Sequence, residues 1–254
     1  MAQASQELQQ LYAELIHRMR QGVDMHEQLA DYYGFLNLPG YQKCHEYQML
    51  CELLTYRKAK DMYMKEYNQL VPPANMMNNL TNMGNNNNGM NSMNNTKNYS
   101  NVIPQGWYAH TRYDVDASTK RNAVKDGFKQ WIDYEKETKE FLMQMGQKLE
   151  QQNEREAARK LDYLIDHVEK EIESAEEKMM ALENSGYDMN YILQQQDHLK
   201  AKYADKIRKI NMKEDQFRQR GRGNYANYNN YDYDDEDDDF NYYYDHPIYR
   251  RGRY

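Results

Sequence analysis

The stretch "GFKQWIDYEKETKEFLMQM" (residues 127–145) carries the pattern that decides the fold. Mostly apolar side chains recur in it at intervals of three and four residues, the spacing that places side chains on one face of an α-helix. The stripe consists of Phe128, Trp131, Thr138, Leu142 and Met145. Glu135 falls inside the same stripe. The stretch therefore predicts a helix that buries one face and, with it, a carboxylate.

Glu135 needs a partner if it is buried. An isolated carboxylate in an apolar interior costs several kcal/mol unless it is paired with a cation or coordinated. The partner is either a positively charged side chain or a metal ion, and the stripe by itself leaves both open. Which of the two it is decides most of what the sequence says about function.

The same periodicity predicts four further helices and an all-α fold. Together with the helix of the opening stretch, they span residues 5–36, 39–70, 119–150, 154–184 and 188–217. The connection before Pro39 is so short that the first two helices must run antiparallel. Asp116 or Ser118 is expected to cap the third helix, and Gly186 to end the fourth. The fifth helix has a thinner apolar stripe, which favours a position on the surface or against a partner.

Composition divides the chain into one helical domain and two low-complexity segments. Residues 1–70 form the first helical hairpin, 71–118 an Asn- and Met-rich crossover loop, 119–218 the second hairpin with the fifth helix, and 219–254 a Tyr- and Asp-rich tail. Loop and tail lack a sustained apolar period, so they cannot bury enough surface to offset an ordering entropy of about 1–2 kcal/mol per residue. We expect a disordered tail that contacts a partner protein or another copy of the chain, or that only keeps the protein in solution.

Charge and cysteine usage exclude several classes of function. Residues 224–254 hold eight acidic residues and three arginines, which account for most of the net charge of −7. The nearly neutral remainder argues against nucleic-acid binding, which needs a basic face. Cys44 and Cys51 lie about 10 Å apart along one expected helix and cannot form a disulfide, which suggests a reducing, cytoplasmic compartment. No run of about 18 apolar residues occurs, and "MAQASQELQQL" does not read as a signal peptide, so neither a membrane span nor export is expected.

Three stretches resemble the core helices of ferritin-like proteins. "LADYYGFLNLPGYQKCHEYQMLCEL" (29–53) resembles the end of the first ferritin helix, its turn and the second helix. "FKQWIDYEKETKEFL" (128–142) resembles the start of the third helix, and "LIDHVEKEIESAEE" (164–177) is similar to the acidic fourth helix. The resemblance implies a ferritin-like four-helix bundle of two helical hairpins joined by a long crossover, followed here by a fifth helix and the tail.

The resemblance also implies where a metal centre would lie. Ferritin-like oxidases hold two irons through carboxylates and Glu-x-x-His pairs on four helices. Glu52 matches the second-helix carboxylate and Glu135 the third-helix one, but Thr55 stands where the family has the histidine after Glu52. Arg20 falls near the first-helix carboxylate, and His167 falls near a glutamine of the fourth helix.

Two interpretations of Glu135 follow from these matches. In the first, the family's carboxylate has become a structural ion pair with Arg20. In the second, a single metal site is built from Glu52, Glu135 and His167, with His26 as a further candidate and iron as the implied ion.

The favoured function is a non-catalytic ferritin-like bundle, without a cofactor, that has a structural or interaction role in a homo-oligomeric assembly. The alternative is a ferritin-like iron-binding or oxidase protein with a reduced or relocated metal site. A third is a coat-like or virion-associated assembly protein, which would place the chain in a spore or virion. No phosphate-binding loop, serine elbow or zinc-type cysteine spacing occurs. His17, His45 and His198 are expected on helix flanks.

Overall fold

The computed structural model describes residues 2–73, 99 and 115–220, and every regular element in these ranges is an α-helix. The helices are α1 (Ala2–Phe35), α2 (Pro39–Tyr67), α4 (Ala117–Gln151), α5 (Arg155–Asn184) and α6 (Met189–Arg220). The predicted all-α class is therefore confirmed. Most of the low-complexity loop expected at 71–118 and nearly all of the tail expected at 219–254 lie outside the described residues.

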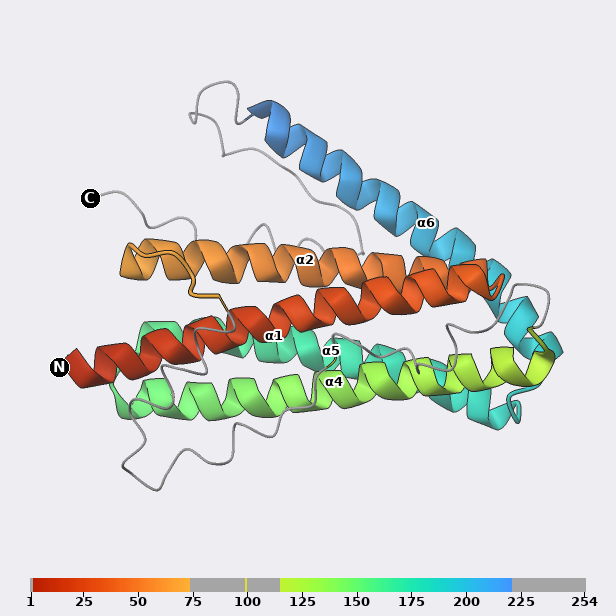
Figure 1. Ribbon diagram of the computed structural model, residues 1–254, viewed down its shortest axis with the longest axis horizontal. Helices are drawn as coiled ribbons and strands as arrows, with labels where there is room; N and C mark the ends of the chain where they lie inside the picture. Colours follow the sequence, from red (N-terminus) through yellow and green to blue (C-terminus); the bar gives the residue numbers. More distant parts are fainter. Residues whose placement is uncertain (1, 74–98, 100–114, 221–254) are drawn as a thin grey trace.

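Helices α1, α2, α4 and α5 lie side by side, and α6 starts beside α2 and diverges from it toward its C-terminal end (Figure 1). Helix α1 packs against α2, α4 packs against α5, and α1 also contacts α4. Helix α6 packs on α2, where the rings of Tyr47 and Tyr203 lie 5.4 Å apart between centroids. The two helices touch at Gly40, because a Cβ atom there would lie 1.9 Å from the carbonyl oxygen of Gln196. The thin apolar stripe of α6 thus covers α2 of the same chain.

The helix ends follow the capping signals of the sequence. Asp116 precedes α4, and its side chain accepts a hydrogen bond from the backbone N–H of Thr119 (2.6 Å), so of the two candidate caps it is Asp116 that acts. Helix α5 stops before Gly186, whose φ of 63° is one that glycine adopts easily. Asp188 then accepts hydrogen bonds from the N–H groups of Asn190 (2.9 Å) and Tyr191 (3.1 Å), which starts α6.

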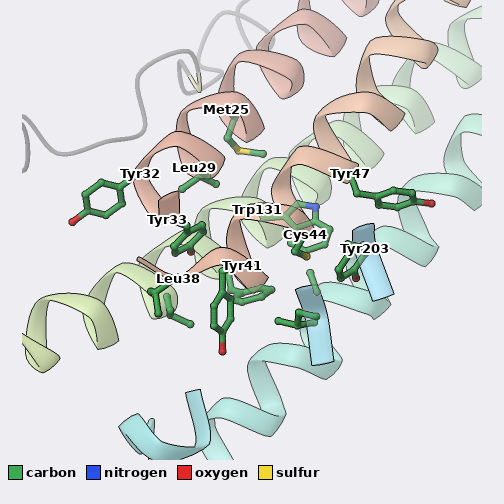
Figure 2. Packing of buried hydrophobic residues seen from close by; sticks show 14 of the residues in the cluster. Met25, Leu29, Tyr32, Tyr33, Leu38, Tyr41, Cys44, Tyr47, Trp131 and Tyr203 are labelled. Atoms are coloured by element: carbon green, nitrogen blue, oxygen red, sulfur yellow. The ribbon is translucent and has the colours of Figure 1, made fainter. Parts of the chain in front are cut away.

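The core consists of two apolar clusters that follow one another along the helices. The first contains Tyr33, Tyr41 and Trp131, which Figure 2 shows packed together with residues of α1 and α2. The second contains Leu11 and Leu142. Every member of the predicted stripe of α4, Glu135 included, is 0% exposed, so the buried face predicted from residues 127–145 is confirmed; these members are Phe128, Trp131, Glu135, Thr138, Leu142 and Met145. Both cysteines are buried and unbonded.

Candidate metal centre

Three carboxylates meet in the interior where the two apolar clusters adjoin. They are Glu52 of α2, Glu135 of α4 and Glu171 of α5, with exposed fractions of 5%, 0% and 6%. One oxygen from each lies within 4.8 Å of one oxygen from each of the others. Helix α4 shows that the acids lie at this boundary. Tyr134, next to Glu135, belongs to the first apolar cluster, and Phe141, six residues after Glu135, belongs to the second. Three acidic side chains from three helices therefore converge on one small interior volume.

Helix α1 contributes space to this volume and no carboxylate. Gly22 faces the cluster, and a Cβ atom there would lie 2.9 Å from Cδ of Glu52 and 2.5 Å from Oη of Tyr134. The hydroxyl of Tyr134 donates a hydrogen bond to the backbone carbonyl of Arg18 (2.9 Å), which holds the ring in place. A side chain at position 22 would force Glu52 or Tyr134 to shift, so glycine here leaves room for the Glu52 carboxylate beside the other two acids.

Burial and mutual repulsion disfavour the charged forms of Glu135 and Glu52. The pKa of Glu135 lies well above its usual value because it is desolvated and because Glu171 and Glu52 are close by. The indole of Trp131 and the charge of Arg18 oppose this rise without cancelling it. The pKa of Glu52 is also raised, first by desolvation and then by Glu171. Without a bound cation, the cluster therefore retains protons that exposed glutamates would lose.

Glu135 also lacks hydrogen bonds of ordinary geometry. Apart from the indole of Trp131, which acts on the carboxyl of Glu135, its two oxygens have no hydrogen-bond partner among the described residues, and neither does Oε2 of Glu171. Buried polar atoms in folded proteins are almost always satisfied, and exceptions point to a missing ion or water or to a functional role. These oxygens are therefore available to bind a cation, and one from each acid lies within 4.8 Å of one from each of the others.

The imidazole of His167 lies at the edge of the cluster. Its Nε2 atom is 3.3 Å from Oε1 of Glu171, one helical turn away on α5. The two side chains are 12% and 8% exposed. Of the three residues predicted as ligands, Glu52 and Glu135 therefore lie together, and His167 adjoins them through Glu171. Glu171 follows His167 by four residues and so shares a helix face with it, but the spacing alone does not show that this face points inward.

The predicted ion pair between Arg20 and Glu135 is wrong. Arg20 has a side chain that is 47% exposed and pairs with Asp24 of its own helix (2.8 Å). The buried cation of α1 is Arg18, which is 5% exposed and donates to Oγ1 of Thr138 (3.3 Å). A step of two residues turns a side chain by about 200° around a helix, so Arg18 faces the interior where Arg20 faces water.

His26 is placed differently from the prediction, because it faces another histidine. Its Nδ1 atom lies 2.8 Å from Nδ1 of His45, and both residues are 0% exposed. Burial lowers the pKa of both histidines. His45 lowers that of His26 further, and Lys178 contributes to lowering that of His45 to about 3. Both rings are therefore neutral. His45 is therefore not on a helix flank as expected, whereas His198 is exposed.

Two other positions do not supply ligands to this centre. Thr55, at the position of the family's second-helix histidine, donates to the carbonyl of Cys51 in its own helix (3.2 Å). One Glu-x-x-His sequence does occur, at Glu14 and His17 of α1, outside the three stretches that resemble ferritin-like proteins. Nε2 of His17 lies 2.9 Å from the carbonyl oxygen of Pro72. Neither Glu14 nor His17 belongs to the acidic cluster.

Comparison with known proteins adds no relative. No protein-family model, no curated protein and no solved structure matches the chain. Within the described residues, no helix is both long enough and apolar enough to cross a membrane, as the sequence predicted.

Proposed function

We propose that this helical protein binds a divalent transition-metal ion through Glu52, Glu135 and Glu171. The observation that carries the proposal is the convergence of three buried carboxylates, with unpartnered oxygens on Glu135, on one point between three helices. A divalent cation removes the mutual repulsion that otherwise favours the protonated forms of Glu52 and Glu135. Oxygen donors with an imidazole nearby suit Mn²⁺, Fe²⁺ or Zn²⁺.

The bound ion would serve first to stabilise the fold. An ion that binds the folded chain and not the unfolded one raises the free energy of unfolding in proportion to the logarithm of its concentration. The depth of the cluster supports this role, because none of the three residues is more than 6% exposed. The proposal thus keeps the expected structural role of the bundle and adds a metal to it. The homo-oligomeric assembly and the partner-binding tail remain predictions.

Iron binding with oxidase activity is the second candidate. It is favoured by the imidazole of His167 next to Glu171, because an oxygen and nitrogen donor set accepts iron readily. Bound iron would supply redox chemistry, and the chain's own carboxylates would hold and orient the ion. This function predicts Fe²⁺-dependent oxygen consumption that is abolished by Glu135→Gln.

Metal content after loading tests the proposal. The protein is incubated with Fe²⁺ without oxygen, or with Mn²⁺, and then freed of unbound metal. We expect near-stoichiometric metal in the wild type, none in Glu135→Gln, and an unchanged amount in Glu140→Gln, which alters an exposed carboxylate of the same helix. Equal metal content in Glu135→Gln and the wild type would contradict the proposal.

A further inference from the structure

Arg18 is a buried cation fixed at one end of the acidic cluster. Its guanidinium donates to Oγ1 of Thr138 (3.3 Å), and its Cζ atom lies 5.6 Å from the ring centroid of Phe141. Thr138 lies one helical turn beyond Glu135 on α4, and Arg18 lies one turn before Gly22 on α1. Helices α1 and α4 pack against each other. The positions of Thr138 and of Arg18 therefore both place the guanidinium on the side of the three acids that faces the second apolar cluster.

The opposite end of the acidic cluster is closed by Trp131. This residue lies one turn before Glu135 on α4 and is 0% exposed. The edges of its ring system pack on His26 and His45, at centroid distances of 5.4 Å and 5.5 Å. An ion held by the three acids is therefore bounded by an aromatic ring at one end and by the guanidinium at the other.

The charges of these buried groups match one divalent ion. In their charged forms the three carboxylates carry three negative charges, and Arg18 carries one positive charge that it does not lose in proteins. Two negative charges remain, which a single divalent ion neutralises. A second divalent ion would leave a buried excess of two positive charges, which is unfavourable because unpaired charges are poorly solvated in the interior.

We infer that the centre binds one divalent ion and that the buried positive charge of Arg18 excludes a second. The inference rests on the proposed function and adds the number of ions and the residue that limits it. Desolvation and the neighbouring acids raise the pKa of Glu135, and the charge of Arg18 opposes that rise, which agrees with a guanidinium close enough to act on the cluster. Arg18 also opposes the desolvation-driven rise in the pKa of Glu14 and of Tyr134, so its charge acts on the whole of this region.

Mn²⁺ is the probe that tests this inference. Elemental analysis counts the ions bound at the centre as the metal content of the protein minus that of Glu135→Gln. Electron paramagnetic resonance then distinguishes an isolated Mn²⁺ from a coupled pair. We expect one isolated ion in the wild type and in Arg18→Lys, which keeps the charge. Arg18→Glu should bind two coupled ions, since it replaces the cation by a fourth carboxylate.

Arg18→Gln covers the case in which a fourth buried acid prevents folding. Removal of the positive charge should tighten the binding of the single ion by at least about tenfold, because the repulsion between two buried cations is then absent. Two ions in the wild type, or equal affinity in Arg18→Gln and Arg18→Lys, would overturn the inference and leave the proposed function standing. Absence of any ion in the wild type would refute the proposed function itself, and the inference with it.

Discussion

Glu135→Gln is the substitution whose effect on stability follows most directly from the structure. Glutamine keeps the size of the side chain and removes its ability to lose a proton. In the native protein the pKa of Glu135 is raised well above 4.5, first by desolvation and then by Glu171 and Glu52. In the unfolded chain the pKa returns to about 4.5. Between these two values the native state holds a proton that the unfolded state releases.

This difference makes the metal-free wild type less stable as the pH rises. Stability changes with pH in proportion to the protons bound by the unfolded state minus those bound by the native state, and that difference is negative here. The free energy of unfolding therefore falls by up to about 1.4 kcal/mol per pH unit for the proton of Glu135. This contribution is fully present below pH 4.5 and disappears as the pH passes the native pKa. Over two pH units the wild type should lose up to about 3 kcal/mol that Glu135→Gln retains.

Urea denaturation followed by circular dichroism measures this gap, with a chelator present, at pH 6.5, 7.5 and 8.5. The window begins at 6.5 because the lowered pKa values of His26 and His45 act only below that value. A buried amide has its own cost, but that cost does not vary with pH, so the slope carries the test. Glu140→Gln should follow the wild type at every pH. A gap between Glu135→Gln and the wild type that stays constant across the window would refute the reasoning.

Substitutions at four other positions test other parts of the structure. Gly22→Ala should lower the free energy of unfolding by about 1–3 kcal/mol and weaken Mn²⁺ binding in a titration, because its methyl group would displace the carboxylate of Glu52. Unchanged binding would contradict the position of Gly22 beside Glu52. Replacing either His26 or His45 by Leu should cost about 1–3 kcal/mol in urea denaturation, and the double variant less than the sum, because a single change leaves a buried nitrogen unpaired. Below pH 6.5 the wild type should lose stability as its unfolded state takes up protons, and the double variant should lose less; equal acid sensitivity would exclude a neutral native pair. Gly40→Ala should separate α6 from α2 and make α6 more sensitive to proteolysis, because its Cβ atom would overlap the backbone of Gln196, and unaltered cleavage would argue against that contact.

The helices and the buried stripe could be predicted because they depend on local periodicity. Residues 127–145 place Glu135 on the same face as Trp131 and Leu142, and that relation holds whatever the helix packs against. The resemblance to ferritin-like proteins singled out Glu52 on another helix, which periodicity could not connect to Glu135. That resemblance remains a prediction.

The partners of the buried groups could not be predicted, because they depend on how the helices are rotated against one another. A difference of two positions separates Arg18, which is buried, from Arg20, which is exposed. His26 and His45 meet because α1 and α2 pack with those positions facing, and no local pattern marks the pair. For Glu171 the sequence offered two acids near His167, and only the phase of α5 shows which one points inward.

An anomalous diffraction map from crystals soaked in Mn²⁺ would locate the bound ion. We expect one peak between α2, α4 and α5, with an oxygen of Glu52, Glu135 and Glu171 bound to it and the guanidinium of Arg18 alongside. A map without a peak among these three side chains, in crystals where Mn²⁺ is bound elsewhere, would contradict this expectation.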